Sequence, residues 1–355
     1  MKCKRIIETV ISLACLASSA AAQPLTVATL NVDGLPEKIV VISLNSDGPG
    51  EDGTKRASSY LAAKGYDFVG VQEDFYYHDQ LWSELKSGYY RGEWQGFSTG
   101  SLPWFHLDGL KFDTDGLCEF WQKRHQCLNE DAVTWNDAYG RFDHANDALC
   151  NKGFRRLEMR LASGRQLVVY NMHMDASDDK DEAEQKDAKD KAARLAQWAQ
   201  LKDDVMQHLD TRPVIVVGDM NSLYIRDDVK SVFIDAINES GRATVADVFL
   251  ELNKQGEETL DKILYINPVM GTKIQPVAFT LDKDGYQNEG KPLGDHYPVA
   301  ATFKVVTRTT SINEVKQDTG DNKRFYDLRG QEVNQPKNGI YIEQKDGKAD
   351  KRVVK

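Results

Sequence analysis

The 355-residue sequence has only five cysteines and no zinc-type cysteine pattern. Three of them, Cys118, Cys127 and Cys150, lie beyond the N-terminal segment. An odd number allows one disulfide and one free thiol, and the sequence does not determine which two cysteines would pair. Because no CxxC cluster occurs, a structural zinc site is disfavoured.

The sequence also lacks long apolar runs and excess positive charge. Beyond the N-terminus no run reaches the roughly 18 apolar residues of a membrane-spanning helix, so we expect a soluble mature protein. Lys and Arg number 45 against 55 Asp and Glu, which gives a net charge of -10. Nucleic-acid affinity normally rests on Lys and Arg, so this charge argues mildly against a nucleic-acid partner, although it does not describe any single face.

Residues 1–22 are predicted to be a secretory signal peptide. The segment has early Lys and Arg, a short apolar stretch and small residues ending at Ala22, which is the layout of such a peptide. Gln23 would begin the mature protein, which we expect to be secreted or to lie at the cell surface or in the periplasm. Cys15 leaves lipoprotein-type acylation as a minor alternative.

Strand-like runs separated by helical stretches predict a mixed α/β (α+β) layered fold. The helical stretches are 55–66 and 181–209; the strand-like runs are 25–32, 68–73, 157–161, 166–174, 213–221, 262–266 and 297–306. The run "PVIVVGDMN" (213–221) is almost unbroken in apolar residues before Gly218, as in a strand buried on both faces. Asp219 and Asn221 at its end would form a turn or, on an extended chain, point to the same side.

The composition changes after Val306. Residues 307–322 are polar without apolar periodicity and are predicted to link a main domain, 23–306, to a small β-module, 323–355. The motif "YDLRGQEV…GIYI" of this module resembles the C-terminal appendages that serve sorting or surface display in secreted proteins of Bacteroidota. A stabilising tail is the structural alternative.

Polar residues of one chemical kind recur at strand ends. In chain order they are Asn31 and Asp33, Gln72 and Glu73, Asn171, His173 and Asp175, Asp219 and Asn221, Asp261, and Asp295 with His296. Each alone has a structural explanation as a cap or turn residue, but together they favour one shared site. Carboxylate and amide oxygens suit Mg²⁺, Mn²⁺ or Ca²⁺. With histidines for acid–base work, the set predicts metal-assisted hydrolysis of a phosphate ester.

The motifs "TLNVDGLP", "VGVQE", "NMHMDAS", "VVGDMN" and "GDHYPVAATF" resemble, in this order, those of the endonuclease/exonuclease/phosphatase superfamily. The resemblance covers residues 25 to about 306. It implies a DNase I-like, four-layered sandwich of two packed mixed β-sheets flanked by helices, and it makes 23–306 the catalytic domain.

The resemblance also implies a metal site. Glu73 is the expected metal ligand, assisted by Asn31, with Asp295 at the metal side of the rim. The expected ion is Mg²⁺, with Mn²⁺, Co²⁺ or Ca²⁺ as alternatives.

Five further residues carry the catalytic roles that the resemblance implies. His296 is the expected general base, and Asp261 the acid that orients it. His173 would bind the scissile phosphate. Asp219 and Asn221 would position the phosphate and the nucleophile, with Asp219 a possible proton donor to the leaving oxygen.

Local features favour a sphingomyelinase-like substrate. The stretch "NDALCNKGFRRLEMRL" (146–161) resembles secreted bacterial sphingomyelinases, which implies cleavage of sphingomyelin to ceramide and phosphocholine at a phospholipid or sphingolipid membrane surface. Lys152, Arg155 and Arg156 would face an anionic phosphate or form an exposed basic turn. Aromatic residues in 74–82 and 102–110 would enter the lipid interface or be buried.

Other functions stay open at this stage. A secreted DNase I-like endonuclease would take nucleic acid as substrate through Arg91, Arg141, Arg155 and Arg156. An inositol-phosphate-type phosphatase shares the fold. An inactive surface binding module is disfavoured, because the complete set of catalytic residues is present. We expect a monomer.

Overall fold

The computed structural model describes residues 24–39, 42–43, 47–96, 105–106, 111–140, 144–177, 188–224, 229–252, 256–306, 324–327, 330–333, 337, 339–345 and 348–354. The chain divides into two compact units, Met1–Thr307 and Arg308–Lys355. The predicted signal peptide (1–22) and linker (307–322) lie outside the described residues.

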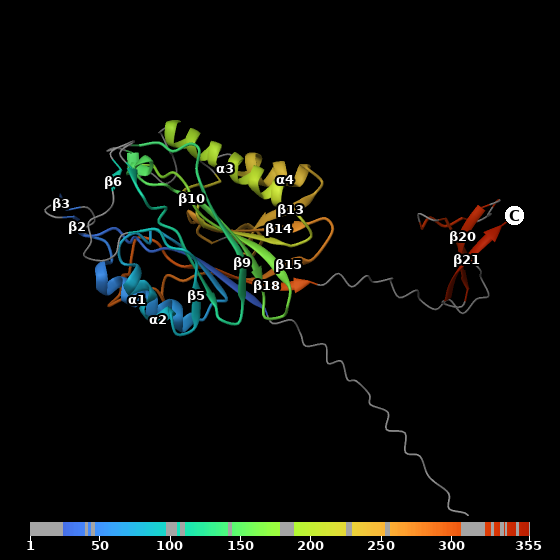
Figure 1. The fold of residues 1–355 in the computed structure, drawn as a ribbon, viewed down its shortest axis with the longest axis horizontal. Helices are drawn as coiled ribbons and strands as arrows, with labels where there is room; N and C mark the ends of the chain where they lie inside the picture. The colour runs from blue at the N-terminus through green and yellow to red at the C-terminus, as the bar shows by residue number, and fades with distance from the viewer. Residues whose placement is uncertain are drawn as a thin grey trace, which may run out of the picture. The chain divides into compact units, whose positions relative to one another are not determined.

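Two six-stranded mixed sheets form the larger unit (Figure 1). The first sheet has the order β15-β18-β1-β4-β8-β5 and consists of β1 (Leu25–Asn31), β4 (Phe68–Gln72), β5 (Tyr89–Arg91), β8 (Cys118–Gln122), β15 (Lys273–Leu281) and β18 (Val299–Val306). Strand β1 runs parallel to β4, and the other neighbours are antiparallel.

The second sheet has the order β13-β14-β12-β11-β10-β9. Its strands are β9 (Gln126–Thr134), β10 (Gly153–Arg160), β11 (Gln166–His173), β12 (Val214–Asp219), β13 (Ala243–Asp247) and β14 (Asp261–Pro268). Only β11 and β12 are parallel among the described neighbours. Every residue of β12 is buried, because this central strand is covered on both faces, as its apolar sequence predicted.

Helices cover the two outer faces. On one side lie α1 (Gly50–Lys64) and α2 (His78–Leu85), and on the other α3 (Ala188–His208), the π-helical turn η2 (Lys230–Asp235) and α4 (Ala236–Glu239) (Figure 1). Three buried apolar clusters correspond to the three contacts between layers: helices against each sheet, and sheet against sheet. The predicted four-layered, DNase I-like sandwich is confirmed.

Shorter elements connect these layers. They are β2 (Lys38–Ile39), β3 (Ile42–Ser43), β6 (Phe105–His106), β7 (Lys111–Phe112), the 3₁₀ helix η1 (His144–Leu149), α5 (Val248–Leu252), β16 (Gln287–Asn288) and β17 (Lys291–Pro292). In the smaller unit, β19 (Arg324–Tyr326), β20 (Gly339–Lys345) and β21 (Lys348–Val354) form an antiparallel sheet. Its resemblance to sorting appendages stays a prediction.

The disulfide that the sequence allowed is not formed. Cys118 on β8, Cys127 on β9 and Cys150 after η1 are all free thiols. None of the helices in the described ranges is long and apolar enough to cross a membrane.

Candidate active site

Strand ends of both sheets meet at one rim of the sandwich. The parallel pair β1 and β4 aligns Asn31 with Gln72, and the parallel pair β11 and β12 aligns His173 with Asp219. The antiparallel pair β12 and β14 aligns Asp219 with Asp261. The register of three strand pairs therefore brings residues from distant parts of the sequence to the same edge.

Glu73, His173 and Asp219 form the first cluster, with ligand atoms within 4.8 Å of one another. His173 Nε2 lies 3.8 Å from Glu73 Oε1 and 3.6 Å from Asp219 Oδ2. Asn31 Nδ2 donates to Glu73 Oε1 (2.8 Å) and to Asp219 Oδ2 (3.1 Å). Its Oδ1 accepts the N–H of Asp33 (2.9 Å). Asn31 therefore orients both acids as a donor, and its assistance in metal binding stays a prediction.

Asp219, Asp261 and His296 form the second cluster. His296 Nδ1 lies 2.6 Å from Asp261 Oδ2, and His296 Nε2 lies 3.7 Å from Asp219 Oδ2. The His296 side chain is 16% exposed, against 4% for Asp261. With its Nδ1–H donated to Asp261, the imidazole keeps Nε2 to accept a proton, which is the arrangement of a general base and its orienting acid.

Burial controls the protonation of the first cluster. It raises the pKa of Glu73 to about 7, against the opposing effects of Lys152 and Asn31. Burial also lowers the pKa of His173 well below its usual value, and the positive charge of Lys152 adds to this effect. His173 is therefore a neutral imidazole that accepts hydrogen bonds.

In the second cluster the neighbouring acids favour the protonated form of the histidine. Burial lowers the pKa of His296, but Asp261 and Asp219 outweigh it and raise this pKa well above its usual value. Burial raises the pKa of Asp261, against the effect of His296. Positive charge held beside Asp219 would lower the pKa of His296 toward the range in which it accepts a proton.

Lys152 reaches the site from the loop before β10. Its Nζ lies 3.0 Å from His173 Nε2 and is ion-paired with Asp147, and the Lys152 side chain is only 8% exposed. Burial lowers the pKa of Lys152, but Asp147 outweighs this effect and raises it. Asp147 was not identified from the sequence, because its partner is known only once the loop is folded.

The other two basic residues of this stretch lie elsewhere. Arg155 is 1% exposed and forms ion pairs with Asp115 (2.9 Å) and Glu130 (3.0 Å). Arg156 pairs with Asp204 (2.8 Å), a residue of α3. The alternatives of phosphate contact and exposed turn are both wrong for Arg155, because its side chain enters the space between the sheets.

The donor set fits a hard divalent cation. Glu73, which is partly buried, and Asp219, which is buried, are two acids with ligand atoms within 4.8 Å of each other, and like charges at this distance repel unless a cation offsets them. Oxygen donors of this kind favour ions such as Mg²⁺. Asp295 is exposed and belongs to neither cluster within the described residues, although its charge contributes to the raised pKa of Glu73.

Backbone strain is concentrated at this rim. Four described residues other than glycine have positive φ: Asp33 (47°), Glu73 (57°), Asn221 (45°) and Glu289 (53°). The first three adjoin or belong to the site. Strained conformations persist where the surrounding structure enforces them, and they favour a functional assignment for this rim.

Asn221 does not lie on an extended chain. Its φ of 45° shows that the backbone turns after Asp219, where β12 ends. Its N–H donates to Asp219 Oδ1 (3.0 Å) and its Nδ2 to the Met174 carbonyl (3.0 Å). The prediction that the two side chains share one side of a strand is wrong, and Asn221 instead fixes the Asp219 carboxylate.

Of the four aromatic residues in 74–82 that were expected at a lipid interface, Phe75 and Tyr77 are buried, and Tyr76 and Trp82 are partly buried. In 74–82, Phe75 is 6% and Tyr77 is 7% exposed, because the segment leads into α2, which packs on the first sheet. Most of 102–110 and Arg141, which the nuclease alternative named, lie outside the described residues.

No family model matches the sequence. The chain is 26% identical over 294 residues to proteins described as sphingomyelinases of Mycobacterium bovis and Mycobacterium tuberculosis. The match covers 80% of this chain and 53% of those proteins, so the chain spans about half the length of the curated relatives it matches.

Solved structures share the fold. Beta toxin from Staphylococcus aureus superposes with a TM-score of 0.54 at 17% identity, covering 78% of this chain and 99% of that one. TDP2 of D. rerio, complexed with a single-strand DNA product, gives 0.53 at 17%, covering 79% and 99%. An endonuclease/exonuclease/phosphatase family protein of Bacteroides thetaiotaomicron gives 0.52 at 16%, covering 79% and 94%. The chain is thus similar in sequence to proteins described as sphingomyelinases, and it shares the DNase I-like fold with these solved structures.

Proposed function

We propose that this chain is a secreted, Mg²⁺-dependent phosphodiesterase that cleaves sphingomyelin to ceramide and phosphocholine at a membrane surface and acts as a monomer. The observation that carries the chemistry is the His296–Asp261 pair (2.6 Å) facing Asp219, beside Glu73. The sphingomyelinase similarity over 80% of the chain supports the choice of lipid.

His296 is the general base of the proposed reaction. Its Nε2 takes a proton from a water that attacks phosphorus directly, without a covalent enzyme intermediate, while the bond from phosphorus to the ceramide oxygen breaks and that oxygen is protonated by solvent. Asp261 holds the Nδ1–H and stabilises the imidazolium that forms. Burial raises the pKa of Asp219, but His296 and the hydrogen bonds from Asn31 and the Asn221 N–H outweigh it and lower this pKa, so the Asp219 carboxylate supports the positive charge.

Positive charge and hydrogen-bond donors complete the site. Glu73 and Asp219 would hold the cation, which when bound supplies charge neutralisation to a nonbridging phosphate oxygen and to the leaving oxygen. Lys152, fixed by Asp147 and by His173 Nε2 (3.0 Å), adds a cation next to this centre. In this proposal His173 orients Lys152 by accepting its N–H, and both residues lie on the side of the site that binds the phosphate.

A comparison of two substrates tests the proposal. Purified protein is assayed on sphingomyelin vesicles and on plasmid DNA, with Mg²⁺ and with EDTA. His296→Ala is compared with His208→Ala, since His208 is an exposed α3 residue remote from the rim. Phosphocholine release that needs both Mg²⁺ and His296, but not His208, supports the sphingomyelinase assignment. Plasmid nicking with the same dependence and no phosphocholine release would make the protein a nuclease.

Secretion is tested separately. Cell fractions and culture medium are probed for the protein, and its N-terminus is sequenced. We expect a mature chain that begins at Gln23 outside the cytoplasm; a full-length chain retained inside would refute the signal-peptide assignment.

A further inference from the structure

One polar side chain crosses between the two sheets. Asn171 lies on β11, two residues before His173, and is completely buried. Its Nδ2 donates to the Val71 carbonyl (3.0 Å) and to Glu119 Oε1 (2.7 Å), and its Oδ1 accepts Gln72 Nε2 (2.6 Å). All three partners belong to β4 or β8 of the opposite sheet.

On one side this amide adjoins the apolar cluster between the sheets. The cluster between the sheets includes Val27, Phe68, Leu157, Val169, Ile215 and Val217. Neither Asn171 nor its partners Gln72 and Glu119 is accessible to solvent. Because buried polar groups are costly unless paired, these hydrogen bonds favour the relative position of the two sheets in which all of them form.

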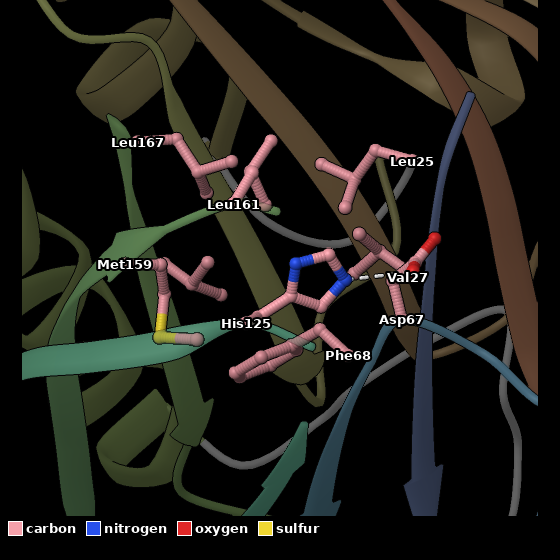
Figure 2. A pocket seen from close by; sticks show the side chains of 9 residues that line it. Leu25, Val27, Asp67, Phe68, His125, Met159, Leu161 and Leu167 are labelled. Carbon is pink, nitrogen blue, oxygen red and sulfur yellow. Dashed lines mark hydrogen bonds and ion pairs between the residues drawn. The ribbon is translucent and has the colours of Figure 1, made fainter. Parts of the chain in front are cut away.

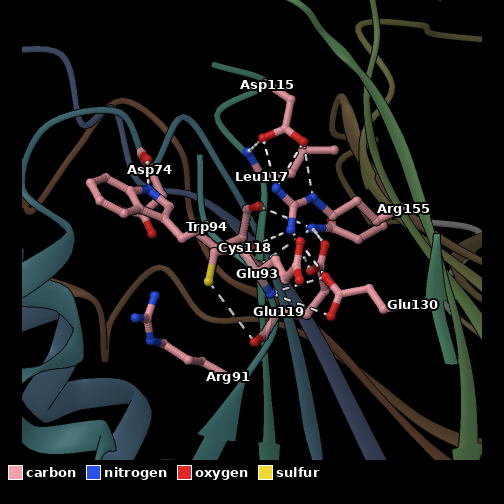
Figure 3. A network of polar contacts seen from close by, with 12 residues as sticks. Asp74, Arg91, Glu93, Trp94, Asp115, Leu117, Cys118, Glu119, Glu130 and Arg155 are labelled. Atoms are coloured by element: carbon pink, nitrogen blue, oxygen red, sulfur yellow. Dashed lines mark hydrogen bonds and ion pairs between the residues drawn. The ribbon is translucent and has the colours of Figure 1, made fainter. Parts of the chain in front are cut away.

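The buried Arg155 lies beside Glu119, a hydrogen-bond partner of Asn171 on the first sheet (Figure 3). Arg155 is the cross-strand neighbour of Asn171 on β10, so both side chains point toward the first sheet. Arg155 Nη1 lies 3.8 Å from Glu119 Oε2, and Arg155 also pairs with Asp115 (2.9 Å). Glu119 is therefore held between an amide and a guanidinium of the second sheet.

The first sheet leaves room for the amide at Gly70. A Cβ built at Gly70 would lie 2.7 Å from Asn171 Oδ1 and 2.6 Å from Val217 Cγ2. Such contacts are too short, so a side chain here would displace either the amide or the β12 residue. The glycine and the asparagine are complementary across the interface.

The residues joined by the amide lie next to the two halves of the site. Gln72 is followed directly by Glu73, and Asn171 is followed two positions later by His173, the last residue of β11. Glu73 comes from the first sheet, whereas His173 and Asp219 come from the second. The distance between these halves depends on how the sheets sit on one another.

We infer that Asn171 is a positioning residue, whose hydrogen bonds to Gln72 and Glu119 hold Glu73 at the distance from His173 and Asp219 that metal binding requires. The inference rests on the proposed metal-dependent function. Outer residues that orient metal ligands typically change metal affinity or activity by about 10–100-fold when replaced.

The test compares Asn171→Leu with Val169→Ala, measuring Mg²⁺ affinity by calorimetry, kcat, KM and the unfolding midpoint. Val169 lies on the same strand and is 1% exposed, but it packs in the apolar cluster. Both variants should lose stability. Only Asn171→Leu should bind Mg²⁺ about 10-fold or more weakly and lower kcat by a similar factor, with KM little changed.

A third variant, Asn171→Ser, keeps a small donor and should show a smaller change in Mg²⁺ affinity; it serves alone if Asn171→Leu does not fold. Wild-type Mg²⁺ affinity and kcat in a folded Asn171 variant, or an equal loss in Val169→Ala, would overturn the inference. Failure of the proposed function would give a different result. In that case the wild type would itself show no Mg²⁺ binding that depends on Glu73, as measured by comparison with Glu73→Gln.

Discussion

Two histidine–aspartate pairs lie at opposite ends of the sandwich, one beside the starts of β4 and β9 and the other beside the starts of β14 and β18. They differ in what the second imidazole nitrogen contacts. At the far end from the rim, His125 Nε2 lies 2.8 Å from Asp67 Oδ1 (Figure 2). The Nδ1 of His125 accepts the Ala162 N–H (3.1 Å). At the rim, His296 Nδ1 contacts Asp261 (2.6 Å), while its Nε2 is 3.7 Å from Asp219. Both nitrogens of His125 are used, whereas His296 keeps one for a reacting proton.

The environments of the pairs support this distinction. The cavity beside His125 is only about 10 Å³ and is lined mainly by aliphatic and aromatic residues, so it holds no substrate. A third pair, His78 and Asp74 (2.5 Å), is closed by Arg91 Nη1, which lies 2.8 Å from His78 Nε2. A histidine–aspartate pair therefore indicates catalysis only where the imidazole nitrogen that does not contact the aspartate has no other hydrogen-bond partner in the protein.

The largest effect is expected when the His296–Asp261 pair at the rim is broken. His296→Gln should lower kcat by about 10²–10⁴-fold, because the proton acceptor is lost, while the free energy of unfolding changes by about 1 kcal/mol or less. Phosphocholine release and urea unfolding measure the two quantities. Activity within tenfold of the wild type would show that His296 is not the base.

A second prediction concerns the cation next to the site. Lys152→Met leaves Asp147 buried without its ion pair, which should reduce the free energy of unfolding by about 3–5 kcal/mol. Adding Asp147→Asn should restore much of this stability but not the activity, if Lys152 contributes charge to the reaction. Recovery of both in the double variant would give Lys152 a purely structural role.

The His125–Asp67 pair, which lies away from the rim, should affect stability and leave catalysis unchanged. Arg124 and His125 outweigh the burial of Asp67 and lower its pKa from 3.8 to about 2. This lowered pKa adds about 2 kcal/mol to stability above pH 4, and the contribution is lost as the pH falls from about 4 to 2. Asp67→Asn should therefore unfold more easily at neutral pH, show a flatter stability profile across this range, and keep its kcat. Urea unfolding between pH 2 and 7 measures this; a large loss of kcat would contradict it.

The smallest effect is expected for Arg156, whose pairs with Asp204 and Asp131 lie partly exposed on the α3 side. Arg156→Ala should cost about 1 kcal/mol or less and leave KM nearly unchanged. Steady-state kinetics on vesicles provides the check. A several-fold rise in KM would return Arg156 to the substrate site.

Much of the fold follows from local sequence, and some of it does not. Runs such as Val214–Val217 are apolar on both faces and identify central strands, whereas β9 is an exposed edge strand with a polar sequence and was not predicted. Because an edge strand buries only part of one face, the apolar pattern of its sequence is weak. The long helix was predicted from residue 181, and the structure describes it from Ala188.

The sequence by itself determined the layered fold, the superfamily resemblance and the polar residues that end the strands, because apolar runs and their polar termini are encoded over a few neighbouring residues. Only the tertiary structure decided which basic residue serves the site. Lys152 reaches His173, Arg155 enters the sheet interface, and Arg156 faces α3. Neighbouring strand residues alternate between faces, and what covers each face is set by packing between segments far apart in the chain.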